Sequence, residues 1–229
     1  MLIFAHRGVH DRKMSENTLE AFARAVEMKA DGIEFDVRVS RDGELVVIHD
    51  ENLHRVAGDA RRVRDLTKNE LKDVLLRGRG SIPTLNDITS SVPPPMMFDI
   101  EIKDRDAIPP LIAKLQTSAS LRDRAIVSSF VLDDLVQVSA GVPGIRTAIL
   151  MRSWPLLFRG QALWRRLEEA KVWGVGFPVN ILNARRMHVL RQRGWSVLSW
   201  DLQPLKREAK RLARLSPDVA IVFRVDSCH

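Results

Sequence analysis

Short apolar runs alternate with amphipathic helical patterns along this chain, and the alternation limits the folds open to it. The predicted strands cover residues 3–5, 33–39, 96–102, 125–128, 145–150, 172–176, 196–199 and 219–223, with a further short run at 44–48. The predicted helices cover residues 18–28, 107–116, 133–139, 161–170, 184–193 and 205–215. Strands that alternate with helices favour a parallel sheet. In such folds ligands bind at the carboxyl ends of the strands.

Two of the predicted strands carry alternating acidic side chains. Glu34 and Asp36 are two positions apart in one strand, so their side chains point to the same face. A later strand repeats the alternation with Asp99, Glu101 and Lys103. Two carboxylates on one face repel each other unless a cation intervenes, and oxygen ligands of this kind suit Mg²⁺ or Ca²⁺. We therefore expect a divalent metal site at Glu34 and Asp36, with Glu101 as the third ligand.

Two histidines come at the ends of short apolar runs. His6 follows the first run and is followed by Arg7 and Gly8, and the glycine allows a sharp turn or a close approach to an anion. His49 ends the run at 44–48 and is followed by Asp50. Because imidazoles titrate near neutral pH, the two histidines can act as general base and general acid in one turnover. Asp50 either orients an imidazole or caps the following turn.

Together these groups fit metal-assisted chemistry on a phosphate ester. Lys103 shares the face of Glu101, and with Arg7 it would neutralise phosphate charge that the metal leaves uncovered. Each feature also has a structural alternative. Paired carboxylates are compatible with a solvated strand face, and a lone histidine at a strand end is more often structural.

Several short motifs follow one another in an order typical of one enzyme family. They are His-Arg-Gly at 6–8, Ser-Glu-Asn-Thr-Leu-Glu-Ala-Phe at 15–22, Asp-Gly-Ile-Glu-Phe-Asp-Val at 31–37, Asp-Gly at 42–43, Val-Val-Ile-His-Asp at 46–50, Ile-Pro-Thr-Leu at 82–85, Ile-Glu-Ile-Lys at 100–103 and Ser-Ser-Phe at 128–130. By these motifs the chain closely resembles the glycerophosphodiester phosphodiesterase family. The resemblance is strong over residues 1–130 and weaker beyond them.

The resemblance implies an α/β fold, a (β/α)8 TIM barrel with a small insertion. Residues 1–229 would form a single glycerophosphodiesterase-like domain, with the insertion at about 51–82. A chain of 229 residues that is 45% hydrophobic is long enough for one barrel at the lower end of that fold's size range. The segment at 51–82 breaks the strand and helix alternation and holds one isolated helical patch at 67–76.

The resemblance also implies an activity and a set of site residues. The enzyme would hydrolyse a glycerol phosphodiester to glycerol 3-phosphate and an alcohol, through a cyclic phosphate formed by the neighbouring glycerol hydroxyl. In this reading the catalytic pair is His6 and His49, the metal ligands are Glu34, Asp36 and Glu101, and the substrate-binding residues are Arg7, Lys103 and Trp200. The cofactor would be a divalent ion, Mg²⁺ or Ca²⁺, with Mn²⁺ as a further possibility.

The chain departs from the family pattern in two regions. Ser15 stands where the family usually has proline, which loosens the entry to the first helix. Near the end of the chain, Trp200 is retained, but Asp201 follows it in place of the usual Thr-Val-Asn continuation, and 220–225 lacks the family's Thr-Asp pair. These positions help to shape the substrate pocket. The leaving group that is accepted would therefore differ from that of typical members.

Charge and one loop leave other substrates and partners open. Residues 1–114 hold 18 lysines and arginines against 20 acidic residues, whereas residues 115–229 hold 18 against 9. Such asymmetry is found in proteins that bind anionic partners, but arginine-rich helix exteriors are commoner. The segment 152–159, with Trp154 and Phe158 between arginines, suits a weak membrane contact or a lysophospholipid substrate. A non-catalytic phosphate-ligand or nucleic-acid binder is the remaining alternative, and we expect no nucleic acid.

The ends of the sequence add two expectations. The first apolar run is too short for the core of a signal peptide, so we expect a cytoplasmic protein. The single cysteine, Cys228, excludes an internal disulfide and a cysteine metal cluster.

Overall fold

Eight parallel strands close into a barrel in the computed structural model, which describes residues 1–154, 157–200, 206–223 and 225. The barrel strands are β1 (Leu2–His6), β2 (Gly32–Val39), β4 (Met97–Ile102), β5 (Ala125–Ser129), β6 (Arg146–Leu150), β7 (Gly174–Pro178), β8 (Ser196–Trp200) and β9 (Val219–Val222). Neighbouring strands pair in the order β1-β9-β8-β7-β6-β5-β4-β2, and pairing between β1 and β2 closes the ring. The predicted (β/α)8 barrel is confirmed.

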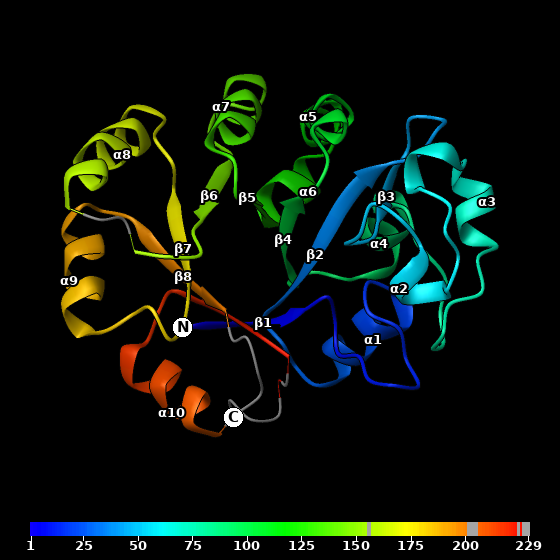
Figure 1. The fold of residues 1–229 in the computed structure, drawn as a ribbon, viewed down its shortest axis with the longest axis horizontal. Coiled ribbons are helices and arrows are strands. Elements are labelled where there is room, and N and C mark those ends of the chain that lie inside the picture. The colour runs from blue at the N-terminus through cyan, green and yellow to red at the C-terminus, as the bar shows by residue number, and fades with distance from the viewer. Residues whose placement is uncertain (155–156, 201–205, 224, 226–229) are drawn as a thin grey trace.

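Helices surround the barrel on its outer side (Figure 1). They are α1 (Leu19–Glu27), α4 (Leu85–Ser91), α5 (Ile108–Thr117), α6 (Ala119–Arg124), α7 (Leu132–Gly141), α8 (Leu157–Glu169), α9 (Ala184–Gln192) and α10 (Lys206–Leu215), with the 3-10 turn η2 (Arg105–Ala107) before α5. The sequence did not predict α4 or α6. Both are short, at 7 and 6 residues, so neither has the two full turns that make a helical period recognisable.

The apolar core has two layers. The larger lies between the outer face of the barrel and the helices and contains Phe22, Phe35, Phe98 and Leu111, all fully buried. A smaller cluster fills the inside of the barrel and consists of Phe4, Ile126, Ala148, Leu198, Val219 and Ile221. Because this inner cluster closes one end of the barrel, polar side chains can face solvent only from the other end.

Residues 45–82 depart from the strand and helix alternation. They contain β3 (Leu45–Val47), α2 (His54–Ala57), the 3-10 turn η1 (Val63–Asp65) and α3 (Lys68–Lys72). This segment has its own buried apolar cluster, made by Val46, Ile48, Leu53, Val63, Leu66, Leu71, Val74 and Ile82. The helix expected at 67–76 is shorter than predicted, and it begins at a capping box between Thr67 and Glu70.

The strand before His49 is not a strand of the parallel barrel. β3 pairs antiparallel with the end of β2, Val37 opposite Val47 and Val39 opposite Leu45. The chain therefore runs back toward the barrel, and the amide of Ile48 donates to the carbonyl of Asp36. The parallel sheet that the sequence favours therefore does not include the run at 44–48 before His49. His49 instead reaches the carboxyl-terminal end of the barrel strands through the antiparallel β2–β3 hairpin.

Local sequence signals explain where the outer helices begin and which face they bury, as α1 shows. Thr18 caps α1 by accepting from the amide of Ala21, and Ala21, Phe22 and Ala25 are buried on one face. None of the described helices is long and apolar enough to cross a membrane.

Candidate active site

Three carboxylates from two neighbouring strands meet inside the open end of the barrel. Asp36 of β2 lies opposite Glu101 of β4 in register, and Glu34 lies two residues earlier on the same face, opposite Asp99. One carboxylate oxygen from each of Glu34, Asp36 and Glu101 lies within 4.8 Å of the other two. All three side chains are buried. The side-by-side pairing of β2 and β4 thus produces the cluster that alternation in the sequence predicted.

Without a cation, burial disfavours the ionised forms of these carboxyl groups. Loss of solvation, followed by the charge of Asp36, raises the pKa of Glu34 well above its usual range and that of Glu101 to about 7. Asp99 behaves alike, with burial raising its pKa to about 7. Glu34 Oε1 has no hydrogen-bond partner among the described residues. Buried carboxylate oxygens within reach of one another and short of donors fit a hard divalent cation.

Two cations line the same cluster. The Lys103 ammonium lies 2.5 Å from Glu101 Oε1 and 3.3 Å from Asp36 Oδ1. Arg7 Nε lies 3.1 Å from Asp36 Oδ2, and the Arg7 amide donates to Glu34 Oε2 at 3.0 Å. Arg7 adopts a positive φ of 56°, a strained conformation for a residue with a side chain, so its direction is fixed by the surrounding fold. Both cations come from ends of barrel strands.

His6 lies at the end of β1 between the carboxylates and an aromatic ring. Its Nε2 is 3.8 Å from Glu34 Oε2. The ring of Phe223 packs on the imidazole at 4.4 Å between centroids, edge to face. Burial, followed by the charge of Arg7, lowers the pKa of His6 well below its usual value. The imidazole is therefore neutral at pH 7 and able to accept a proton.

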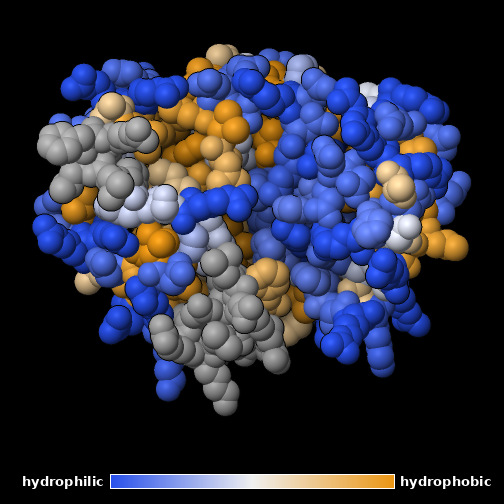
Figure 2. All heavy atoms as spheres, viewed as in Figure 1, coloured by the Kyte–Doolittle hydropathy of each residue, from blue (hydrophilic) through white to orange (hydrophobic). Residues whose placement is uncertain are grey.

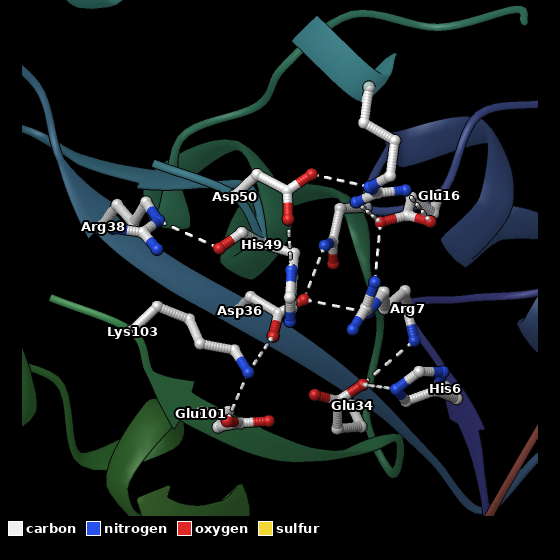
Figure 3. Close-up of polar contacts among 12 residues, drawn as sticks. His6, Arg7, Glu16, Glu34, Asp36, Arg38, His49, Asp50, Glu101 and Lys103 are labelled. Carbon is white, nitrogen blue, oxygen red and sulfur yellow. Dashed lines mark hydrogen bonds and ion pairs between the residues drawn. The ribbon is translucent and has the colours of Figure 1, made fainter. Parts of the chain in front are cut away.

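His49 lies across the pocket and is held by Asp50. The His49 Nδ1 and Asp50 Oδ1 atoms are 2.6 Å apart, and Arg38 Nε donates to the His49 carbonyl at 2.9 Å (Figure 3). An ionised carboxylate only accepts, so Nδ1 carries the proton and Nε2 is left for chemistry. Burial, the largest cause, lowers the pKa of His49 below its usual value. Of the two roles that the sequence left open for Asp50, orientation of the imidazole is the one observed.

Most of these side chains line one cavity of about 450 Å³ at the open end of the barrel, whereas Asp36 is fully buried behind its wall. Its wall contains His6, Arg7, Glu34, His49, Asp99, Glu101, Lys103, Phe130, Leu150, Arg152, Pro178, Trp200, Ile221 and Phe223. One side of this wall is polar and comes from β1, β2 and β4, whereas the other is largely apolar and comes from the later strands. Figure 2 shows a corresponding division around the hollow on this face, hydrophilic over the segment 45–82 and more hydrophobic over β6 to β8.

A second, open groove of about 710 Å³ adjoins this cavity. The two share five lining residues, His49, Glu101, Lys103, Phe130 and Arg152. Arg152 lies over the ring of Phe130 at 4.7 Å, so this pair stands at the boundary between the hollows. Trp200 also contacts Phe130, edge to face, with ring centroids 6.0 Å apart.

Four further residues of this region had no predicted role. Asn17 donates to Asp36 Oδ2 at 2.8 Å, and Glu16, Arg55 and Phe223 contact Arg7, Asp50 and His6 respectively. Glu16 and Asn17 fall in the family motif at 15–22, which is the signal in the sequence that marks them. No local pattern marks Arg55 or Phe223, because their contacts join distant parts of the chain.

Comparison with known proteins now defines the family. The model of the glycerophosphoryl diester phosphodiesterase family matches residues 6–227. The chain belongs to this family. It is therefore an enzyme, and the predicted family is confirmed.

Relatives of this glycerophosphodiester phosphodiesterase family member agree in sequence and fold. A glycerophosphodiester phosphodiesterase from Caldanaerobacter subterraneus subsp. tengcongensis is 33% identical over 178 residues, covering 70% of this chain and 73% of that protein. The crystal structure of a glycerophosphodiester phosphodiesterase from Thermotoga maritima matches with a TM-score of 0.83 and 30% identity, over 99% of this chain and 96% of that one. A phosphodiesterase from Oleispira antarctica, solved with its product sn-glycerol-3-phosphate, shares the fold at 22% identity and a TM-score of 0.84, over 99% and 95% of the two chains.

The loop expected to touch a membrane is only partly within the described residues. Trp154 packs inward, with its ring 5.3 Å from that of Phe177 and 5.7 Å from that of Trp164. Residues 155 and 156 and the side chain of Phe158 lie outside the described part of the chain. Trp154 is thus packed against its neighbours in the fold.

Proposed function

We propose that this enzyme hydrolyses glycerophosphodiesters to glycerol 3-phosphate and an alcohol, with His6 and His49 as its acid and base. The observation that carries the proposal is the convergence in one cavity of two imidazoles, three buried carboxylates and Arg7. This set supplies a proton acceptor, a proton donor and a cationic site for a phosphodiester.

Glu34, Asp36 and Glu101 would hold a divalent ion. Their oxygens are close enough to share one cation, and burial disfavours their joint ionisation without it. When bound, Mg²⁺, Ca²⁺ or Mn²⁺ would neutralise charge on the phosphoryl oxygens and polarise the phosphorus toward attack. Lys103, which contacts two of these carboxylates, remains beside the phosphate and adds a second positive charge.

The chemistry needs two proton transfers at each step. One imidazole accepts the proton of the glycerol 2-hydroxyl as its oxygen bonds to phosphorus, and the other gives a proton to the departing alcohol as its P–O bond breaks. The product is a cyclic phosphate. In the second step the imidazoles exchange roles. Water gives a proton to one imidazole as its oxygen bonds to phosphorus, and the other imidazole gives a proton to the glycerol 2-oxygen as the bond from that oxygen to phosphorus breaks, which leaves glycerol 3-phosphate. The neutral state of His6 suits the acceptor role in one of these steps.

The inner cavity and the outer groove would each hold one of the two groups esterified to the phosphate, the glycerol and the alcohol. Arg7 would bind the phosphate between them, because its guanidinium is fixed by Asp36 and Glu16. Trp200 would line the inner cavity, and the outer groove, which is open and rich in charged side chains, would take the departing alcohol. This division favours polar alcohols such as choline or ethanolamine.

An alternative substrate is a lysophospholipid. The apolar side of the inner cavity, with Phe130, Leu150, Pro178, Trp200 and Phe223, favours it. The same histidines and carboxylates would then act on a diester whose glycerol carries an acyl chain.

A direct assay tests the proposal. After chelation, with Mg²⁺, Ca²⁺ or Mn²⁺ added back, glycerol 3-phosphate release is measured from glycerophosphocholine and glycerophosphoethanolamine. Release of the alcohol is measured from a lysophospholipid, whose phosphate product keeps the acyl chain. We expect release that needs a metal and falls by at least about 10³-fold in His6→Ala and in Glu34→Gln, because an acid-base group and a metal ligand are each lost. Metal-independent release, or full activity in His6→Ala, would contradict the proposed mechanism.

A further inference from the structure

Glu16 and Arg55 connect the two ends of the proposed active site without lining its inner cavity. Glu16 precedes α1, and Arg55 belongs to α2 in the segment that follows β3. Arg55 Nη1 and Nη2 donate to Glu16 Oε2 and Oε1 at 2.9 and 2.7 Å, a bidentate pair across 39 residues of chain. Neither residue is in the wall of the 450 Å³ cavity. Arg55 lines the outer groove, so an effect on the phosphate or on the reacting oxygens in the inner cavity must pass through other side chains.

One branch of this pair reaches Arg7. Glu16 Oε1 accepts from Arg7 Nη1 at 2.9 Å, while Arg7 Nε lies 3.1 Å from Asp36 Oδ2 (Figure 3). The Arg7 guanidinium is thus held from two sides. The carboxylate of Glu16 has a side-chain exposure of 13%, and its hydrogen bond to Arg55 and the charges of Arg7 and Arg55 outweigh burial to hold its pKa below the usual value. It remains ionised while it holds both guanidinium groups.

The other branch reaches His49. Arg55 Nε donates to Asp50 Oδ2 at 2.6 Å, and the second oxygen of the same carboxylate lies 2.6 Å from His49 Nδ1. Asp50 therefore has its two oxygens fixed by Arg55 and His49. A carboxylate fixed in this way keeps the proton of its histidine on Nδ1 and fixes the orientation of the imidazole ring.

We infer that Glu16 and Arg55 are positioning residues, which act together to aim Arg7 at the phosphate and His49 at the reacting oxygens. The inference rests on the proposed function of Arg7 and His49. Because Arg55 lies on α2, docking of this short helix on the loop before α1 completes the site. The segment between β3 and α4 then contributes to catalysis through Arg55 as well as through its folding.

The two branches predict different kinetic effects. Arg55→Gln frees Asp50 and should lower kcat about 10-fold, within the range seen when a group that orients a histidine is lost. Glu16→Gln cannot hold two guanidinium groups and should raise KM about 10-fold, because Arg7 loses one of its two carboxylate partners. Arg55→Lys keeps the positive charge but cannot form the bidentate contact of a guanidinium group, and it should give an intermediate loss in kcat. Thermal unfolding of each variant checks that the fold is retained.

Arg61→Gln is the matched control. Arg61 lies in the same segment, forms a forked contact to Asp59 Oδ2 at 2.8 and 2.6 Å and has 55% side-chain exposure, against 47% for Arg55. It touches none of the site residues among its described contacts. Its substitution removes the same charge and an arginine–carboxylate pair in the same segment, and we expect unchanged kcat and KM.

A double-mutant cycle separates positioning from a merely structural role. If Arg55 acts through Asp50, the double variant Arg55→Gln/Asp50→Asn should have nearly the kcat of Asp50→Asn alone. Additive losses in kcat, or kinetic constants of Arg55→Gln equal to those of Arg61→Gln, would overturn the inference.

Binding provides a readout that does not need turnover. Calorimetric titration with sn-glycerol 3-phosphate in the presence of Mg²⁺ should show about 10-fold weaker binding to Glu16→Gln than to Arg61→Gln. Equal binding to the two variants would refute the Arg7 branch even if the enzyme hydrolyses no glycerophosphodiester. Absence of hydrolysis by the unaltered enzyme, with this difference in binding intact, would instead count against the proposed function alone.

Discussion

At the scale of single residues, the surroundings of His6 depend on Phe223, which follows the last strand. The two rings are in edge contact, with centroids 4.4 Å apart. The pKa of His6 is lowered well below its usual value, first by burial and then by the charge of Arg7. Since Phe223 lies where this chain departs from the family pattern, the departure changes the environment of a proposed catalytic group. It does not remove any of the proposed metal ligands.

Shortening Phe223 should therefore change the pH profile. Phe223→Ala admits water to His6, so the pKa of the imidazole should rise toward its usual value. A general base is lost as the pH falls through its pKa, so the acidic limb of kcat/KM should move to higher pH. Phe223→Leu, which keeps most of the burial, should move it less. An acidic limb that is the same in Phe223→Ala and the unaltered enzyme would show that Phe223 does not control His6.

At the scale of elements, the loop from β1 to α1 places both Arg7 and Glu16. Its close approach to α1 depends on Gly8, which has a φ of +78°. A Cβ at this position would lie 2.8 Å from the Ala21 carbonyl carbon, which belongs to the helix backbone. Glycine is required here for its conformation and for its lack of a side chain. The loop and the first turn of the helix are therefore fixed relative to each other.

Gly8→Ala should destabilise the fold more than the same change at Gly43. Gly43 has a similar φ of +81°, but a Cβ there would meet nothing within 4 Å. Gly43→Ala should cost about 1 kcal/mol for the left-handed conformation. Gly8→Ala should cost about 1 to 3 kcal/mol more, because the helix backbone must shift. Urea unfolding measures both, and equal free energies of unfolding would contradict the steric explanation.

At the scale of the whole molecule, the barrel buries four carboxylates at its open end, Glu34, Asp36, Asp99 and Glu101. The fold places them together because β2 and β4 pair in parallel with Glu34 opposite Asp99 and Asp36 opposite Glu101. Burial raises the pKa of Asp99 and of Glu101 to about 7. The stability of the barrel is thereby linked to pH and to metal.

Without metal, the stability that these carboxyl groups contribute should fall as the pH rises toward and through 7, and the last part of the fall should appear as a lower thermal stability at pH 8.5 than at pH 7. The folded-state pKa values of Asp99 and Glu101 lie above those of the unfolded chain, so the folded state binds more protons between about pH 4 and pH 7. Their contribution is fully present below about pH 4 and is lost as the pH rises through 7. The histidines with lowered pKa values titrate below about pH 6.5 in the unfolded chain and add little above pH 7.

Calorimetry of the chelated enzyme measures this effect. Added Mg²⁺ or Ca²⁺ should raise the Tm, and more so at pH 8.5 than at pH 7, because the ligands must be ionised to bind it. Glu101→Gln should flatten the pH dependence of the metal-free Tm. A metal-free Tm that stays constant or rises between pH 7 and 8.5 would contradict the raised pKa values.

The sequence by itself determined much of the fold and the chemical groups at the site. The eight barrel strands follow from apolar runs of three to seven residues between helical patterns, because strand and helix periods are local properties of the chain. Alternation within two strands placed Glu34 and Asp36 on one face of the first strand and put Glu101 in a similar pattern on the second strand. The motif His-Arg-Gly marked His6 and Arg7, and these residues lie in the same cavity as the carboxylates.

Only the tertiary structure decided how distant segments meet. The antiparallel return of β3 brings His49 to the open end, although the local pattern of β3 is that of any short strand. Glu16 and Arg55 are 39 residues apart and pair through space, and Phe223 meets His6 from the other end of the chain. Such contacts depend on closure of the barrel and on side-chain directions. These are set by the packing of the whole fold, and no local sequence period encodes them.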